Sequence, residues 1–70
     1  MNNFTFGNYI YELRIKKGLT QVQLGKKLGV SNKAVSKWEN GRAYPSVELM
    51  LPIAEELGVS VDELHSAIKR

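Results

Sequence analysis

Four glycines divide this chain of 70 residues into short segments. Gly18, Gly29, Gly41 and Gly58 each follow a stretch in which apolar residues recur at the spacing of an α-helix. A glycine in that position is typical of a helix C-terminus, where the chain commonly needs a positive φ. The spacing therefore predicts an all-α fold of five short helices, one before each glycine and one after the last.

Residues that can cap a helix stand before four of these segments. Two pairs match the capping box, in which side chain and backbone bond each other across the first turn: Thr20 with Gln23, and Ser60 with Glu63. Ser31 and Ser46 are expected to begin the third and fourth helices. Asn40-Gly41 is also typical of a β-hairpin, but its flanking residues follow the helical period, so it is predicted to end a helix.

The apolar face of each helix predicts the core. The residues expected to point inward are Phe6, Ile10 and Leu13, then Leu24 and Leu28, then Val35 and Trp38, and finally Val61, Leu64 and Ile68. Pro52 lies where the fourth helix should continue, and it lacks a backbone N–H. It is therefore expected to kink or delay that helix.

The size of the chain predicts a single domain over residues 1–70 with a small core. There is no cysteine, and His65 is the only histidine, so neither a disulfide nor a metal site is expected to hold the fold. Without a nucleophile and base pair, no catalytic residue, cofactor or small-molecule substrate is expected, and the chain is predicted not to be an enzyme. His65, beside Asp62 and Glu63, is expected to be solvated.

No stretch of the chain has the features of a membrane span or a signal peptide. The longest apolar run, Leu49 to Ala54, is interrupted by Pro52, and no basic residue precedes an apolar stretch near the N-terminus. The absence of cysteine fits a reducing compartment. We therefore expect a cytoplasmic location without membrane association.

The net charge of +3 is unevenly distributed along the chain. Residues 1–45 carry eight Lys and Arg against two acids, a net charge of +6. Residues 46–70 carry two basic residues against five acids, a net charge of −3. A basic first part favours contact with a polyanion. Ordinary solubilising charge is the alternative.

The third helix, expected from Asn32 to Glu39, separates its side chains into two kinds. Val35 and Trp38 project to one side, whereas the opposite side is polar and carries no acid. The polar side consists of Lys33, Ser36, Lys37 and Asn40, with Asn32 at its edge. These residue types can bond base edges, since Lys suits guanine and Asn suits adenine, but a solvated helix face has the same composition.

The segment before the third helix favours contact with base edges over a solvated face. A short helix that ends at Gly29, a tight turn, and a second helix with a basic polar face form a helix-turn-helix, whose second helix enters the major groove of duplex DNA. The motif is expected over about residues 20–40.

Several runs of residues are those of a known family. They are Leu19-Thr20-Gln21, Leu24-Gly25, Leu28-Gly29-Val30-Ser31, Val35-Ser36-Lys37-Trp38-Glu39-Asn40-Gly41, Pro45-Ser46 and Leu57-Gly58-Val59-Ser60. Over about Phe6 to Leu64 the chain resembles the Cro/CI-type (XRE-type) helix-turn-helix regulators. The resemblance implies a compact five-helix, lambda-repressor-like domain of a prokaryotic or phage transcriptional regulator. Most such regulators are repressors, and they often bind palindromic operators in double-stranded DNA as homodimers.

The resemblance also assigns roles to residues by position. It implies base reading by Asn32, Lys33, Ser36 and Lys37, phosphate contacts by Gln21, Asn40, Arg42 and Tyr44, and a structural ion pair between Arg14 and Glu39. Gln21 is further expected to brace the base-reading helix. Two positions depart from the family: Gly25 stands where alanine is usual, and Val22, at a usually polar position, is either an exposed apolar residue or a contact to a thymine methyl group.

An antitoxin, or another protein-interaction module, uses the same fold and is the alternative function. An antitoxin usually needs an extra segment that embraces its toxin, and this chain ends at Arg70, a few residues after the last expected helix. A regulator is therefore expected, unless the chain is a fragment of a longer protein.

Overall fold

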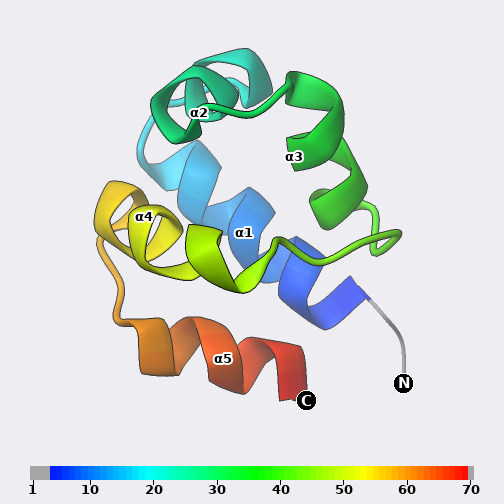
Figure 1. Ribbon diagram of the computed structural model, residues 1–70, viewed down its shortest axis with the longest axis vertical. Helices are drawn as coiled ribbons and strands as arrows, with labels where there is room; N and C mark the ends of the chain where they lie inside the picture. The colour runs from blue at the N-terminus through cyan, green and yellow to red at the C-terminus, as the bar shows by residue number, and fades with distance from the viewer. Residues whose placement is uncertain (1–3, 70) are drawn as a thin grey trace.

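The computed structural model describes residues 4–69, and this part of the chain forms helices without a strand (Figure 1). The helices are α1 (Phe4–Lys16), α2 (Gln21–Leu28), α3 (Asn32–Glu39), α4 (Val47–Leu57) and α5 (Val61–Lys69). The prediction of an all-α fold with five helices is confirmed.

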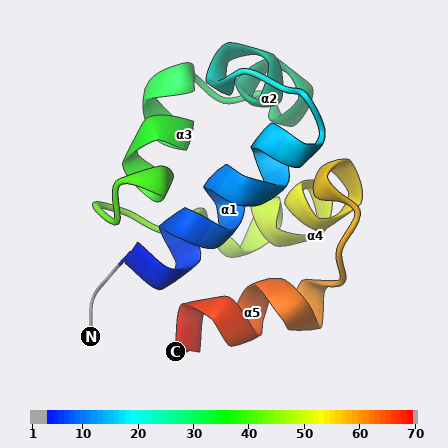
Figure 2. The same cartoon turned by 180° about the vertical axis from the view of Figure 1, so that it is seen from behind.

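The helices pack around a middle formed by α1 and α4. Figures 1 and 2 show α2 and α3 at one end of the molecule, α5 at the other, and α1 and α4 between them. The fold measures 29 × 23 × 22 Å along its principal axes. This arrangement leaves the outer side of α3 uncovered by any other helix.

The local signals in the sequence end the helices where expected. Gly18, Gly29, Gly41 and Gly58 all have a positive φ, between 71° and 75°. Both capping boxes are formed, with the Thr20 hydroxyl accepting from the Gln23 backbone N–H at 3.0 Å in the first, and the reciprocal pair of bonds joining Ser60 and Glu63.

The two remaining serines differ. Ser31 Oγ accepts from the backbone N–H of Ala34 at 3.2 Å and so caps α3. Ser46 occupies the same position before α4, but its side chain makes no capping hydrogen bond. The predicted starts of both helices are confirmed, and only the first has its side-chain cap.

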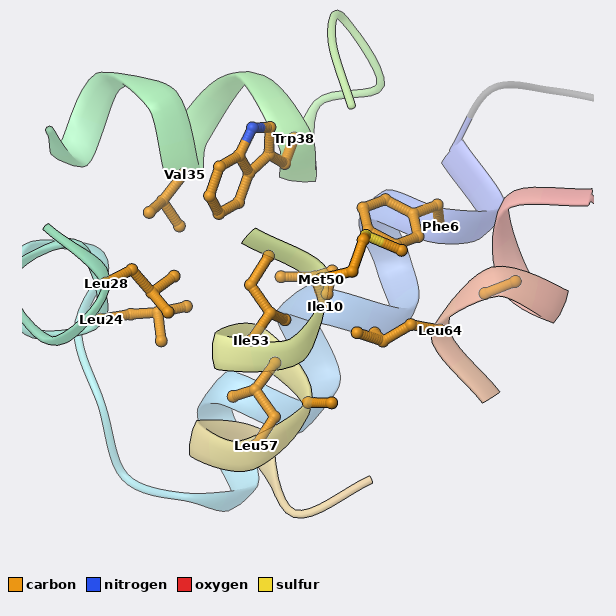
Figure 3. Close-up of a cluster of buried hydrophobic side chains, with 12 residues drawn as sticks. Phe6, Ile10, Leu24, Leu28, Val35, Trp38, Met50, Ile53, Leu57 and Leu64 are labelled. Atoms are coloured by element: carbon orange, nitrogen blue, oxygen red, sulfur yellow. The ribbon is translucent and has the colours of Figure 1, made fainter. Parts of the chain in front are cut away.

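One cluster of buried apolar side chains joins all five helices (Figure 3). It consists of Phe6, Ile10, Leu24, Leu28, Val35, Trp38, Met50, Ile53, Ala54, Leu57, Leu64 and Ala67. Val35 and Trp38 point from α3 toward Leu24 and Ile53, which confirms their predicted inward direction. Because both side chains are buried, α3 cannot rotate without exposing a tryptophan.

The structure corrects the predicted core of α5. Val61 was expected to point inward, but it is 39% exposed, whereas Leu64 and Ala67 are buried. Val61 lies in the first turn of α5. The helical period predicts the direction of a side chain, but not whether another element lies opposite the end of the helix.

The structure corrects one of the two alternatives expected at Pro52, a delayed start of the helix. The fourth helix is not delayed, since α4 begins at Val47, directly after Ser46, and continues through Pro52 to Leu57. The proline removes one backbone hydrogen bond, to the carbonyl of Glu48. The same helix buries four side chains, Met50, Ile53, Ala54 and Leu57, and this burial outweighs the loss of one bond.

Two glycines allow backbones to approach closely. A Cβ atom at Gly7 of α1 would lie 2.5 Å from the carbonyl oxygen of Glu39 and 2.7 Å from that of Trp38, at the end of α3. A Cβ atom at Gly25 would lie 2.7 Å from the carbonyl oxygen of Val30. A small residue was expected at position 25, and here even the alanine usual in the family would force the backbone to shift.

Gly7→Ala tests the approach of α1 to α3. Alanine raises helix propensity by about 0.5–1 kcal/mol, but here its methyl group meets two backbone carbonyls that cannot move independently. We expect a net loss of about 2 kcal/mol in the free energy of unfolding, measured by urea denaturation. Asn8→Ala, at the neighbouring exposed position, should change it by less than about 0.5 kcal/mol. Equal stability of the two variants would contradict the close approach.

Candidate nucleic-acid interface

The polar residues of α3 face away from the core. Asn32, Lys33, Lys37 and Asn40 are exposed, and Ser36 is partly exposed. They lie on this side because Val35 and Trp38 hold the opposite side of the helix in the core. The position of the outward face is therefore a consequence of core packing.

This face of α3 forms one wall of a shallow hollow of about 280 Å³. The lining residues come from the start of α2, the outer face of α3 and the loop that follows it: Gln21, Asn32, Lys33, Ser36, Lys37, Asn40 and Arg42. The structure thus brings together seven of the eight residues that were assigned to DNA contacts.

Tyr44 is the eighth residue, and it lies apart from the hollow. Its ring packs edge to face against Phe6, with the centroids 5.5 Å apart and an interplanar angle of 66°. The residue is still 50% exposed. The tyrosine therefore anchors the loop to α1 and leaves part of its surface open.

The hollow is basic. Lys33, Lys37 and Arg42 supply three positive charges, and no acidic residue lines it. Two of its polar side chains bond each other, since Asn40 Nδ2 donates to Ser36 Oγ at 3.3 Å. A surface with several N–H donors and no negative charge suits an anionic partner.

The end of α3 places Arg42. Gly41 turns the chain with a φ of 74°, and the backbone N–H of Arg42 then donates to the carbonyl of Lys37 at 2.9 Å. This hydrogen bond holds the residue after the turn against the last turn of the helix. Arg42 is thereby fixed at the edge of the hollow, beyond the helix itself.

A buried ion pair ties α3 to α1. Arg14 Nε donates to Glu39 Oε2 at 2.6 Å and Arg14 Nη2 donates to Glu39 Oε1 at 3.0 Å. The two residues are 7% and 9% exposed. The hydrogen bond to Glu39 raises the pKa of Arg14 above its ordinary value, against the opposing effect of burial. Bidentate geometry with further bonds is what makes burial of two charges tolerable.

Two contacts of Arg14 were not foreseen from the sequence. Its Nη1 atom donates to the backbone carbonyl of Leu19 at 2.8 Å, and its guanidinium lies 5.3 Å from the ring centroid of Tyr11. The spacing of three residues between Tyr11 and Arg14 on one helix is a signal that could have indicated the second contact. The contact with the Leu19 carbonyl could not have been predicted in this way, because every residue has a backbone carbonyl and its side chain does not indicate which one is used.

Gln21 extends the network to α2. Its Nε2 atom donates to Glu39 Oε1 at 3.0 Å. The carboxylate of Glu39 therefore receives three N–H groups from two different helices. The same network fixes the start of α2 and the end of α3, the two elements that form the hollow with the loop.

Two other kinds of feature, a metal site and a membrane-spanning helix, are absent from the described residues. These residues contain no group of three or more His, Cys, Asp or Glu side chains arranged to hold a metal ion. None of their helices is both long enough and apolar enough to cross a membrane.

A family model described as Helix-turn-helix matches residues 10–64 of this chain. The chain belongs to the helix-turn-helix family. The match covers most of the chain, and it includes all the residues that line the hollow. The Cro/CI-type resemblance inferred from the sequence is confirmed.

Two curated relatives are regulators of transcription. One is the HTH-type transcriptional activator BcrR of Enterococcus faecalis, 44% identical over 61 residues, which are 87% of this chain and 30% of the relative. The other is Repressor protein C2 of Salmonella phage P22, 39% identical over 64 residues, which are 91% of this chain and 30% of the relative. This chain therefore spans about a third of the length of these two helix-turn-helix proteins.

A solved structure supports the same fold. The P22 c2 repressor in complex with a synthetic operator superposes with a TM-score of 0.80 and 39% sequence identity, over 84% of this chain and 89% of that chain. The lambda-repressor-like fold predicted for this helix-turn-helix chain is thus confirmed.

Arg14→Ala should destabilise the fold strongly. It leaves the buried Glu39 carboxylate without its charge partner, and loss of one member of such a pair costs about 3 kcal/mol or more. For a domain of this size the melting temperature should fall by more than about 10 °C in a circular dichroism melt. Arg14→Lys keeps the charge but loses the bidentate hydrogen bonds, so its melting temperature should lie between those of Arg14→Ala and the unaltered chain.

The matched control is Lys16→Ala, which removes an exposed cation from the same helix. It should change the melting temperature little. If Arg14→Ala melts at the same temperature as Lys16→Ala, the Arg14–Glu39 pair contributes no more than a surface ion pair.

Proposed function

We propose that this chain is a sequence-specific binding domain for double-stranded DNA that acts in transcriptional regulation, as a repressor. The observation that carries the proposal is the basic hollow around α3, in which Lys33, Lys37 and Arg42 gather without an acid. Membership of the helix-turn-helix family and the operator complex of the P22 c2 repressor support it.

The dimensions of α3 fit the major groove. An α-helix with its side chains is about 10–12 Å in diameter, and the major groove is about 12 Å wide. In the proposed complex the side chains of Asn32, Lys33, Ser36 and Lys37 meet base edges. Lys donates to guanine O6 and N7, and Asn bonds adenine through both of its polar atoms.

The flanking residues are proposed to hold the DNA backbone. Gln21, Asn40 and Arg42 lie around α3 at the edges of the hollow, where phosphates border a groove that contains the helix. The half-exposed Tyr44 is proposed to add a hydroxyl contact from the same loop. Such contacts fix the orientation of the protein without reading sequence.

Binding without catalysis is proposed to be the whole action of the domain, in the cytoplasm. A repressor needs only to occupy its operator, and Repressor protein C2 is named for repression. BcrR is named an activator, so the fold serves both directions of regulation. Both relatives are regulators, which favours this proposal over an antitoxin or another protein-interaction module.

Two copies are proposed to bind one palindromic operator. Half-sites of helix-turn-helix dimers lie about 34 Å apart along the DNA. The longest dimension of this fold is 29 Å, so two copies can bind adjacent half-sites on one side of the duplex without overlap.

Selection of duplexes from a randomised pool tests the proposal directly. We expect enriched sequences with two inverted half-sites whose centres are about 10 base pairs apart. One protomer with a few base contacts of about 1–3 kcal/mol each has a modest preference, and two protomers reach the usual range of specific binding. A single unrepeated motif would contradict the dimer, and a pool without enrichment would contradict sequence-specific binding.

Alanine variants should separate base reading from phosphate contact. Lys33→Ala and Lys37→Ala should each lose about 1–3 kcal/mol on the selected duplex and relax the preference at one base pair. Arg42→Ala should weaken binding to selected and scrambled duplexes alike and reduce the salt slope by about one. Titration of both duplexes at several salt concentrations measures these effects.

The control for lost charge is Lys17→Ala. The Lys17 ammonium lies near Gly58, at the junction of α4 and α5, and not in the hollow. It should therefore change binding less than the three other variants. If Lys33→Ala, Lys37→Ala and Arg42→Ala lose affinity equally on both duplexes, α3 is only a basic surface and not the reading helix.

A further inference from the structure

The side chain of Gln21 lies between the basic hollow and the carboxylate of Glu39. It lines the basic hollow, and its Nε2 atom donates to the carboxylate of Glu39 behind that hollow. A glutamine amide has two N–H donors on one nitrogen, and its carbonyl oxygen accepts. The partner on one side therefore determines which atoms remain for the other side.

A carboxylate has no proton to donate, so it can only accept hydrogen bonds. The Glu39 carboxylate already accepts one N–H group of Arg14 on each of its oxygens, at 2.6 and 3.0 Å. The amide nitrogen of Gln21, and not its oxygen, must therefore face Glu39. The second N–H group on that nitrogen is left without a partner among the described residues.

This orientation matters for an anionic partner. A phosphate oxygen attracts an N–H donor and repels a carbonyl oxygen, so a freely rotating glutamine offers the right group only part of the time. A side chain already fixed by one hydrogen bond loses less conformational freedom when it binds. The bond to Glu39 thus prepares Gln21 for one kind of contact.

We propose that Glu39 is a positioning residue for DNA binding, which acts through Gln21 by holding its amide with one N–H group available to a backbone phosphate. The inference rests on the proposed function, and it assigns to the Arg14–Glu39 pair a role beyond stability. Arg14 contributes because its two hydrogen bonds hold the carboxylate in place.

The test replaces the ion pair without changing the net charge. Arg14→Met together with Glu39→Met removes one positive and one negative charge, and an apolar pair in place of a buried ion pair commonly preserves stability. Gln21 then has no carboxylate to bond. The duplex is the one selected by the unaltered chain, and binding is measured at one salt concentration and at a temperature where circular dichroism shows each variant folded.

A double-mutant cycle with Gln21→Ala gives the decisive comparison. Gln21→Ala should weaken binding about tenfold, as expected for a hydrogen bond to a charged group. Where Gln21 is present, Arg14→Met together with Glu39→Met should weaken binding about three- to tenfold. In a chain that already carries Gln21→Ala, the same two substitutions should cause no further loss of affinity. The inference would be overturned if the two methionine substitutions cause equal losses of affinity with and without Gln21→Ala, or no loss where Gln21 is present.

A matched control removes another ion pair. Lys27 Nζ lies 3.8 Å from Glu56 Oε1, in a pair that joins α2 to α4 outside the hollow. Lys27→Met together with Glu56→Met makes the same change in charge and should leave the affinity unaltered. A loss as large as that of the Arg14 and Glu39 pair would show that the effect is not specific to Gln21, and would overturn the inference.

Nuclear magnetic resonance tests the same inference on the unaltered protein, so the result does not depend on whether a substituted chain folds. On addition of the selected duplex, one of the two Gln21 side-chain N–H resonances should shift strongly, while the one bonded to Glu39 should shift little. Equal shifts of both resonances, or none, would overturn the inference. If the unaltered chain selects and binds no duplex, the proposed function itself fails, which is a different result from binding without this asymmetry.

Discussion

The bidentate ion pair between Arg14 and Glu39 is the interaction on which the arrangement of the first three helices depends. It joins residues 25 positions apart in the chain. Through the Leu19 carbonyl and the Gln21 amide, it also fixes the connection between α1 and α2 and the start of α2. The apolar core supplies most of the free energy of folding, but apolar contacts are not directional. Hydrogen bonds with fixed geometry define how the start of α2 lies against the end of α3.

Close backbone contact and the ion pair act at the same point. Gly7 brings α1 against the last carbonyls of α3, and the Glu39 side chain reaches back to α1 from the same turn. The end of α3 is therefore held from its backbone and from its side chain, while Trp38 holds it from the core. The loop that carries Arg42 leaves from this fixed point, so its position follows from contacts on the far side of the helix.

Much of the fold could be predicted because its signals are local. Capping boxes and positive-φ glycines act within one turn of a helix, and the inward direction of Val35 and Trp38 follows from one helical period. Errors arose where a second element decides the outcome. Val61 follows the helical period and is still 39% exposed, and Pro52 is tolerated because its helix is well buried. The face of α3 was readable from its own residues, whereas the roles of Gln21 and Arg42 came only from resemblance and stay predictions.

The outward side chains of α3 take little part in holding the domain together. In the part of the chain that the structure describes, the side chains of Lys33 and Lys37 make no hydrogen bond or ion pair, and Asn32 is exposed. Substitutions there leave the core and the buried pair untouched. A lineage of such domains can therefore exchange these residues one by one and acquire new recognition without first gaining stability to tolerate the change. Separation of scaffold from variable surface makes this small fold readily evolvable.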